Sequence, residues 1–511
     1  MAGNVAPSLH HGHRVDAPVR LRVAVTNERE RPMRDQRAEV SLNIAPNEAF
    51  ESAPVEPRSF RILVMGDFSA RGDGGPLASE LPRRVDRDDL DAHVARIAPR
   101  LRVSIDGRSV DLAFAAMDDF HPDRLVARLT ALGHRPETAA NDAPRSAPSH
   151  PIGTAALPDI ARAVSGASLL DDMLDDSVPS TASATRPTRS DELSAFVERA
   201  VAPHLVRAPD AETVARTAAR ERDVTQLLRL VLHHPRVQAL EATWRSLEFL
   251  VRRLDTDGDL DLFMLDVARD QVASTLERLA QRRDAAGDES WALAVSLHGH
   301  PDGDDGADAL ARIALAARAF ETPVVAGAPP SLAGRQSATS LDDDSAPLPP
   351  PEVFTLIRRS LEGRFLGLTF PRVLLRLPYG GQNPCDTLEF EEIDDPNRHD
   401  DYLWGSGATL VALLVGAAFN ERGWAIGPRL SLDVESLPLF TYRRGPETVA
   451  MPCAEIVMSE RIARHLLSRG LMPVAWIKNT DRVRLIELRS VADPAAPLAA
   501  AWTGTTSGLN S

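Results

Sequence analysis

The densest group of titratable side chains forms an acidic segment late in the chain. Its members are Glu391, Glu392, Asp394, Asp395, His399, Asp400 and Asp401. Carboxylates beside a histidine can act as general acid and base, or bind a cation through their oxygens. An α/β enzyme using this segment would hold it in a concave pocket. The alternative is a solvated acidic loop without chemistry.

Two histidine groups could contribute metal ligands. His233 and His234 precede Pro235, and His10, His11 and His13 lie near the N-terminus. A histidine pair needs at least a third ligand, which the sequence does not supply. We therefore interpret the first pair as helix-end capping residues and the second group as part of a polar tail.

Two runs of aspartate resemble part of a calcium loop. The runs are Asp255, Asp257 and Asp259, and Asp302, Asp304 and Asp305. An EF-hand needs glycine at its sixth position and usually glutamate at its twelfth, where the first run has Leu260 and Asp266. Both runs therefore predict polar turns, and no metal site is expected.

Other common catalytic patterns are missing. The one lysine, Lys478, follows Ile477, so the Gly-Lys-Ser/Thr of a P-loop does not occur. Cys385 and Cys453 are too few for a metal cluster and do not suggest a disulfide framework. Residues 71–73 spell the adhesion tripeptide RGD, which here predicts only a loop. We expect no catalytic residue and no cofactor.

Size and charge narrow the class of protein. A chain of 511 residues predicts two or three domains. The formal net charge of −15 argues against nucleic acid or an anionic membrane as the main partner. The longest apolar run, residues 408–419, is too short to span a bilayer, and the N-terminus lacks an export signal. We expect a soluble cytoplasmic protein.

Residues 1–133 predict a small α+β domain. The apolar run at 62–65 predicts a buried strand, and residues 86–97 predict an amphipathic helix. Residues 101–114 alternate between apolar and polar about an Asp-Gly turn and predict a β-hairpin. Pro122 suits the first turn of a following helix.

The rest of the chain predicts a linker and a larger domain. Residues 134–190 are rich in Pro, Ala and Ser and contain one short amphipathic helix at 168–176. Helical periodicity resumes at residue 191, and strand and helix signals alternate from residue 260. Residues 191–511 therefore predict a helical segment followed by a mixed α/β domain, tethered to the small α+β domain.

Several strings resemble the two subunits of the type VI secretion contractile sheath. Between residues 21 and 132, the strings similar to the small subunit are MGDFS at 65–69, VDRDDL at 85–90 and MDDFHP at 117–122. Those similar to the large subunit are LHHP at 232–235, QALEATWRSL at 238–247, LTFPRVLLRLPYG at 368–380, YLWG at 402–405 and KNTD at 478–481. The strings follow the order of the family.

The resemblance implies a natural fusion of the small subunit with a large subunit shortened at its C-terminus. Such a protein would stack helically around an inner tube, and contraction would drive effector delivery without a catalytic residue. The implied partners are other sheath subunits, the inner tube protein, the baseplate and an AAA+ unfoldase that recycles contracted sheath. A sheath-derived cap or baseplate adaptor that does not polymerise is an alternative, and the α/β enzyme is another.

The resemblance also implies one protein-binding segment. The helix at 168–176 resembles the first helix of the large subunit, which the unfoldase recognises. Its apolar residues Leu169, Leu170, Met173 and Leu174 would share one face, as in helices that bind a groove. The alternative is a helix packed on its own domain.

Overall fold

The computed structural model describes residues 59–75, 81–105, 107–132, 211–286, 290–340, 346–426 and 430–506. The chain divides into two units, one of Met1–Thr130 with Asp223–Ser511 and the other of Ala131–Arg222. The second unit is described only at the end of helix α2 (Pro122–Leu132) and over the first part of helix α4 (Ala211–Leu232). All that follows concerns the first unit.

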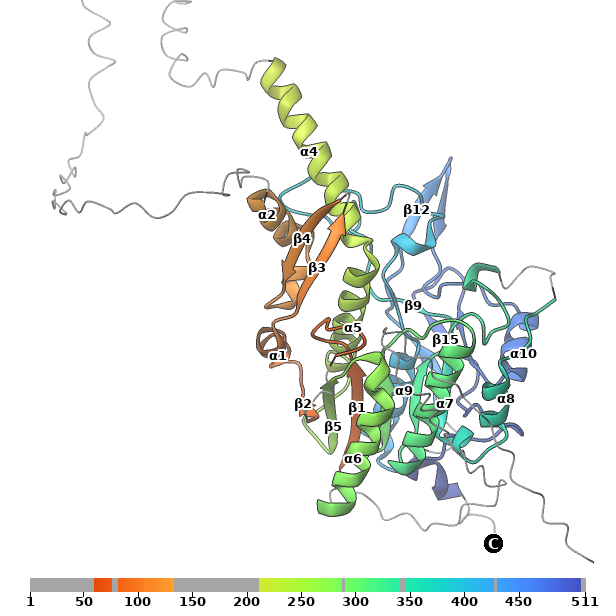
Figure 1. The fold of residues 1–511 in the computed structure, drawn as a ribbon. Helices are drawn as coiled ribbons and strands as arrows, with labels where there is room; N and C mark the ends of the chain where they lie inside the picture. Colours follow the sequence, from red (N-terminus) through yellow and green to blue (C-terminus); the bar gives the residue numbers. More distant parts are fainter. Residues whose placement is uncertain are drawn as a thin grey trace, which may run out of the picture. The chain divides into compact units, whose positions relative to one another are not determined.

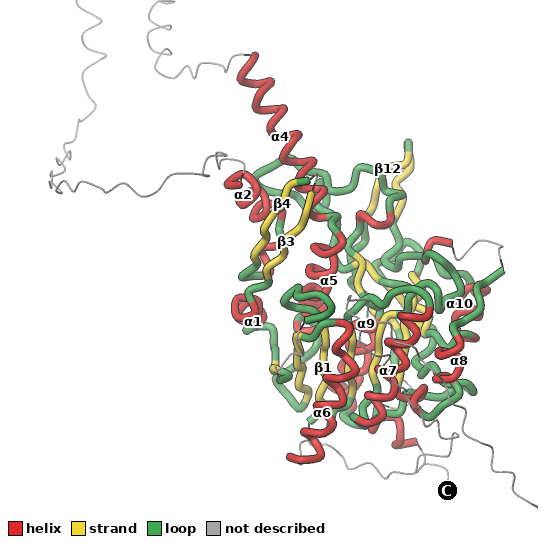
Figure 2. The backbone as a smooth tube through the Cα atoms, in the orientation of Figure 1, coloured by secondary structure: helices red, strands yellow, loops and turns green. Residues whose placement is uncertain are grey.

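A nine-stranded mixed sheet lies at the centre of this unit (Figures 1 and 2). Its strands, in spatial order, are β11 (Asp433–Val434), β15 (Val483–Leu485), β14 (Met472–Trp476), β8 (Leu366–Phe370), β7 (Val324–Gly327), β6 (Leu293–Ser296), β1 (Phe60–Gly66), β5 (Leu260–Asp266) and β2 (Arg83–Arg84). The strands from β14 to β5 are parallel, and β15 and β2 pair with them antiparallel. The mixed α/β fold class predicted from the sequence is confirmed.

Strand β1 joins the two sequence regions in this sheet. It comes from the first region but lies between two strands of the second, with Ile62 opposite Leu262 and Leu293. The expected picture of two separate tethered bodies is therefore revised, because both regions build one sheet. The boundaries predicted at residues 133 and 190 concern residues 133–210, which lie outside the described residues.

Helices cover both faces of the sheet (Figure 1). One face carries α5 (Pro235–Val251) and α9 (Ala408–Arg422), and the other carries α6 (Val272–Ala286), α7 (Asp304–Ala319), α8 (Glu352–Arg358) and α10 (Glu460–Ser468). Successive side chains of β1 serve the two cores in turn: Ile62 and Val64 belong to the first, Leu63 and Met65 to the second. Because both faces of β1 are buried, the strand needs an unbroken run of apolar residues.

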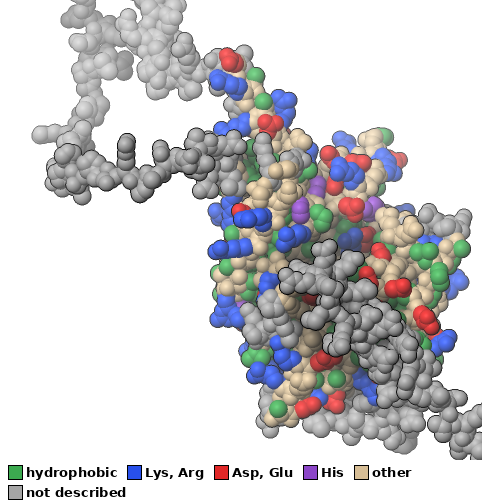
Figure 3. All heavy atoms as spheres, in the orientation of Figure 1, with side chains coloured by type: hydrophobic (Ala, Val, Ile, Leu, Met, Phe, Trp, Pro, Cys, Tyr) green, Lys and Arg blue, Asp and Glu red, His purple; other side chains and the backbone are tan. Residues whose placement is uncertain are grey.

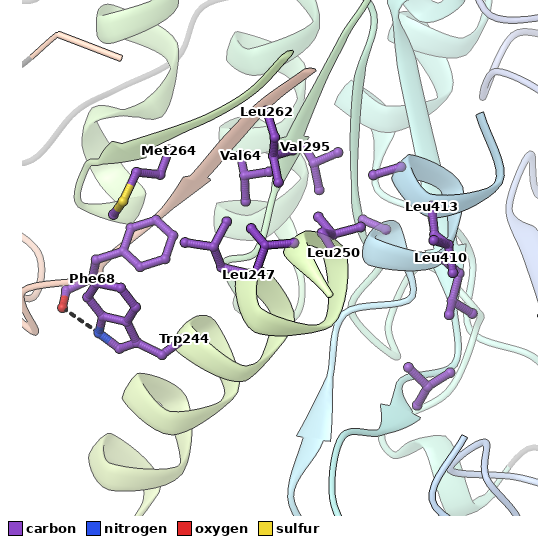
Figure 4. Close-up of a cluster of buried hydrophobic side chains, with 14 of the residues drawn as sticks. Val64, Phe68, Trp244, Leu247, Leu250, Leu262, Met264, Val295, Leu410 and Leu413 are labelled. Carbon is purple, nitrogen blue, oxygen red and sulfur yellow. Dashed lines mark hydrogen bonds between the residues drawn. The ribbon is translucent and has the colours of Figure 1, made fainter. Parts of the chain in front are cut away.

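The core between the sheet and α5 also contains the junction of the two regions (Figure 4). The indole of Trp244 packs edge-on against the ring of Phe68, with 4.9 Å between ring centroids. Its Nε1 donates a hydrogen bond of 3.0 Å to the Phe68 carbonyl oxygen. Both side chains are fully buried, so the first region is anchored on α5 by packing and by a satisfied polar contact.

The remainder of the first region forms a smaller layer, which contains the predicted hairpin and the helices predicted before and after it. Strands β3 (Arg100–Ile105) and β4 (Arg108–Ala113) pair as an antiparallel hairpin beside α1 (Leu90–Ile97) and α2. Arg100 and Arg102 of β3 point outward and Leu101 and Val103 inward. Figure 3 shows basic side chains, in blue, on the side of the molecule where this hairpin lies, at the left of the view.

Two smaller sheets complete the described strands. They are β9 (Val373–Leu374) with β10 (Trp404–Gly405), and β12 (Thr441–Arg444) with β13 (Glu447–Ala450). Among the described residues, no helix has the length and apolar content needed to cross a membrane.

Candidate functional site

The acidic segment reaches into a buried network centred on Arg376. The guanidinium binds Glu392 through Nη1 at 2.7 Å and Nη2 at 2.9 Å. It binds Glu241 of α5 through Nε at 2.7 Å and Nη2 at 3.3 Å. The exposed fraction is 1 % for Glu241, 2 % for Glu392 and 9 % for Arg376. One planar cation thus binds two buried carboxylates from distant parts of the chain, and Arg245 supplies Glu241 with a second cation at 3.3 Å.

The electrostatics of this network favour the charged forms. Burial lowers the pKa of Arg376, but Glu241 and Glu392 outweigh it and hold the pKa well above its usual range. Burial raises the pKa of Glu241, but Arg376 and Arg245 outweigh it, so the net shift is downward. The carboxyl of Glu241 is therefore ionised at neutral pH and cannot act as a proton donor.

The residues of the MDDFHP string and its neighbour Asp123 dock on this network. The ring of His121 meets the ring of Tyr379 edge-on at 4.9 Å, and the Arg376 guanidinium lies 4.2 Å from the centroid of the same tyrosine ring. Asp123 accepts hydrogen bonds of 3.0 Å from the backbone N–H groups of Asp386 and Thr387. Burial raises the pKa of Tyr379 to about 12, so its hydroxyl stays neutral. The string therefore attaches the first region to the second.

A second ion-pair cluster lies beside the first. Nδ1 of His233 is 3.3 Å from Asp401, whose other oxygen is 3.2 Å from Nε of Arg398. Burial lowers the pKa of His233 more than Asp401 and Glu392 raise it. His233 therefore links the end of α4 to the acidic segment, whereas His234 caps α5 by accepting a hydrogen bond from the Arg236 N–H.

Most of the other acidic side chains have structural partners too. Glu391 accepts from the Gly381 N–H at 3.0 Å, Asp394 pairs with Arg398 at 3.3 Å, and Asp395 accepts from Asn397. A cavity of about 300 Å³ is lined by residues of α1 and α5, including Asp91 and Val251, and by none from 391–401. The interpretation as an acid–base site in a pocket has no support.

The remaining candidates also have structural roles. Asp255 accepts from the Asp257 N–H before β5, and Asp302 accepts from the Ser331 N–H. The RGD tripeptide is a loop in which Arg71 pairs with Asp266. Within the described part of the chain, no set of three His, Cys, Asp or Glu side chains could hold a metal ion. Residues 10–13 lie outside this part, as do Leu169, Leu170, Met173 and Leu174.

Sequence reasoning missed the central residues, Arg376, Glu241 and Tyr379. The available signal was a charged residue within an apolar stripe: Glu241 stands beside Leu240 and on the same helical turns as Trp244. Such a residue is buried and must have a partner. The partner, 135 positions away, could not be found from spacing.

The fold and this site define a mixed α/β protein in which two sequence regions build one sheet and the first region docks beside a buried charge network of the second. Residues 215–492 match the family described as VipB: EvpB/VC_A0108, tail sheath N-terminal domain. Residues 30–135 match the family described as Type VI secretion system, VipA, VC_A0107 or Hcp2. The chain therefore belongs to the VipB tail sheath family and carries a VipA-like segment ahead of it.

One curated relative is the type VI secretion system sheath protein TssC1 of Pseudomonas aeruginosa. The two sequences are 28 % identical over 306 residues, which cover 54 % of this chain and 61 % of the relative. The chain thus spans about three fifths of the length of that relative.

Proposed function

We propose that this protein is a structural subunit of a type VI secretion contractile sheath, in which the small and large halves are one polypeptide. It acts in the cytoplasm, without catalysis, by stacking with other copies or with other sheath subunits around an inner tube. Contraction of the stack delivers effectors.

One observation carries the proposal. A strand of the VipA-like segment stands between two strands of the VipB-like segment, and the Phe68–Trp244 hydrogen bond and the hydrogen bonds to Asp123 join the two segments further. The two halves therefore share one sheet and are present in a one-to-one ratio. Joining them in one chain also raises the effective concentration of each half for the other.

Electron microscopy of the purified full-length chain tests the proposal. We expect tubes or stacked rings at high protein concentration, more abundant when the inner tube protein is present. Monodisperse particles under all these conditions would contradict polymerisation. Decoration of only the ends of a separately assembled sheath would instead favour the cap or adaptor alternative.

The proposal includes an unfoldase that recycles contracted sheath. Residues 168–176 are its recognition segment, and the apolar side chains Leu169, Leu170, Met173 and Leu174 make the contact. Changing Leu170 and Met173 together to Glu should abolish capture of the unfoldase in a pull-down, because charge on that face prevents burial. A matched control changes Asp171 to Asn. Equal capture by all three proteins would refute this assignment.

A further inference from the structure

Arginines gather around the C-terminal end of α10, on the far side of the sheet from the Arg376 network. Arg358 ends α8, Arg469 directly follows α10, and Arg489 follows β15. Their side chains donate hydrogen bonds to backbone carbonyl oxygens: those of Val491 and Ser468 for Arg358, of Leu348 for Arg469, and of Leu467, Ser490 and Ala492 for Arg489. We name Arg358, Arg469, Arg489 and the adjoining exposed Arg359 the arginine cluster.

The positive charge of this cluster is not balanced by carboxylates of the described residues. The carboxylate of Asp493 attracts the Arg358 guanidinium, and Oε1 of Glu487 lies 3.8 Å from Nη1 of Arg489. Burial lowers the pKa of Arg469, and repulsion from Arg358 and Arg335 lowers it further. No carboxylate of the described residues raises this pKa. Among the residues that the structure describes, none accepts a hydrogen bond from the buried Nε of Arg469, although only 8 % of Arg469 is exposed.

The end of a helix explains only part of this arrangement. The carbonyl groups at the C-terminus of α10 attract cations, but they amount to about half of a negative charge. Several guanidinium groups held close together in a partly desolvated place repel one another. A buried cation without a counterion is costly, so the site favours an anion that several guanidinium groups can share.

We propose that the arginine cluster binds a compact oxyanion, a phosphate or a carboxylate group, with Arg469 as its central ligand. Guanidinium groups suit such ligands because their N–H donors form paired hydrogen bonds to two oxygens. The exposed Arg359 stands at the rim and attracts the anion.

Titration of the full-length protein with inorganic phosphate tests the site, with chloride at equal ionic strength as reference. We expect phosphate to raise the melting temperature, and R469Q to weaken phosphate binding at least about tenfold, since a charge-assisted hydrogen bond is lost. R464Q removes an exposed arginine of the same helix and should bind as the wild type does. Because R469Q can also disturb folding, R359Q provides a second variant, expected to weaken binding by about twofold to threefold at constant stability.

A tri-aspartate peptide used in place of phosphate distinguishes the two sources of the oxyanion. A rise in melting temperature with either probe, lost in R469Q, supports the proposal and identifies the ligand chemistry. No effect beyond that of chloride, or an equal effect in R469Q and wild type, overturns it. The chain also contains Asp342, Asp343 and Asp344. Phosphate binding that appears only in D342N/D343N/D344N would show that the protein supplies its own anion, and would overturn the proposal.

Discussion

Substitution R376M should be among the most destabilising single changes in this protein. Arg376 makes four hydrogen bonds to two carboxylates that are at most 2 % exposed, at distances from 2.7 to 3.3 Å. Without Arg376, Glu241 still accepts a hydrogen bond from Arg245 at 3.3 Å, and Glu392 still accepts one from the Tyr379 N–H. Removing one partner of a buried ion pair costs about 3–5 kcal/mol, so we expect a loss of that size in the free energy of unfolding.

Urea denaturation followed by circular dichroism measures this loss, with R464M as the control for removal of an exposed arginine on α10. The reasoning also predicts a dependence on pH. In R376M this loss of stability should shrink on acidification, since a protonated Glu241 no longer needs a cation. In the wild type, where the pKa of Glu241 is lowered, stability falls below about pH 4.5. A loss below about 1 kcal/mol, or a deficit independent of pH, would refute the account of the network.

Three further changes test other parts of the structure. Burial lowers the pKa of His300 from its usual 6.5 to about 3, so between these pH values the unfolded chain binds a proton that the folded chain does not. This difference should cost about 2 kcal/mol of stability between pH 7 and pH 5, and H300L should reduce the pH slope by that amount in melts at several pH values. D123A should cost about 1–3 kcal/mol in urea melts, because the N–H groups of residues 386 and 387 lose their acceptor, whereas an unchanged midpoint would show that this contact is dispensable. A chain cut at residue 160 and produced as two fragments should copurify through β1, and fragments that separate during gel filtration would contradict the shared sheet.

Much of the local structure was predictable from short stretches of sequence. The hairpin of residues 101–114 follows from strict alternation, since every second side chain of β3 is buried. The start of α5 follows from Pro235 at its first turn and His234 as its cap. The sheath resemblance rested on strings that the structure brings together: His121 meets Tyr379, and Trp244 meets Phe68. The location of the recognition segment at 168–176 stays a prediction.

The candidate site was predicted less well. For the acidic segment the sequence left two interpretations open, an acid–base site and a solvated loop, because spacing along the chain shows where carboxylates are dense and not which of them are buried and paired. Glu392 is buried against Arg376, which lies 16 residues earlier in the chain, and Asp401 is buried against His233 from a distant segment. Only burial and partner geometry determine whether a carboxylate is reactive or structural.

The sequence by itself determined the helices and strands, the family strings and the lack of common catalytic motifs, because these depend on periodicity and neighbouring residues. The tertiary structure alone decided where β1 lies and which charges are paired. An apolar run such as residues 62–65 fits any interior position of a parallel sheet, so its local pattern carries no information about its neighbours. Its place between β5 and β6 results from long-range packing on both faces, and this packing makes the two regions one structural unit.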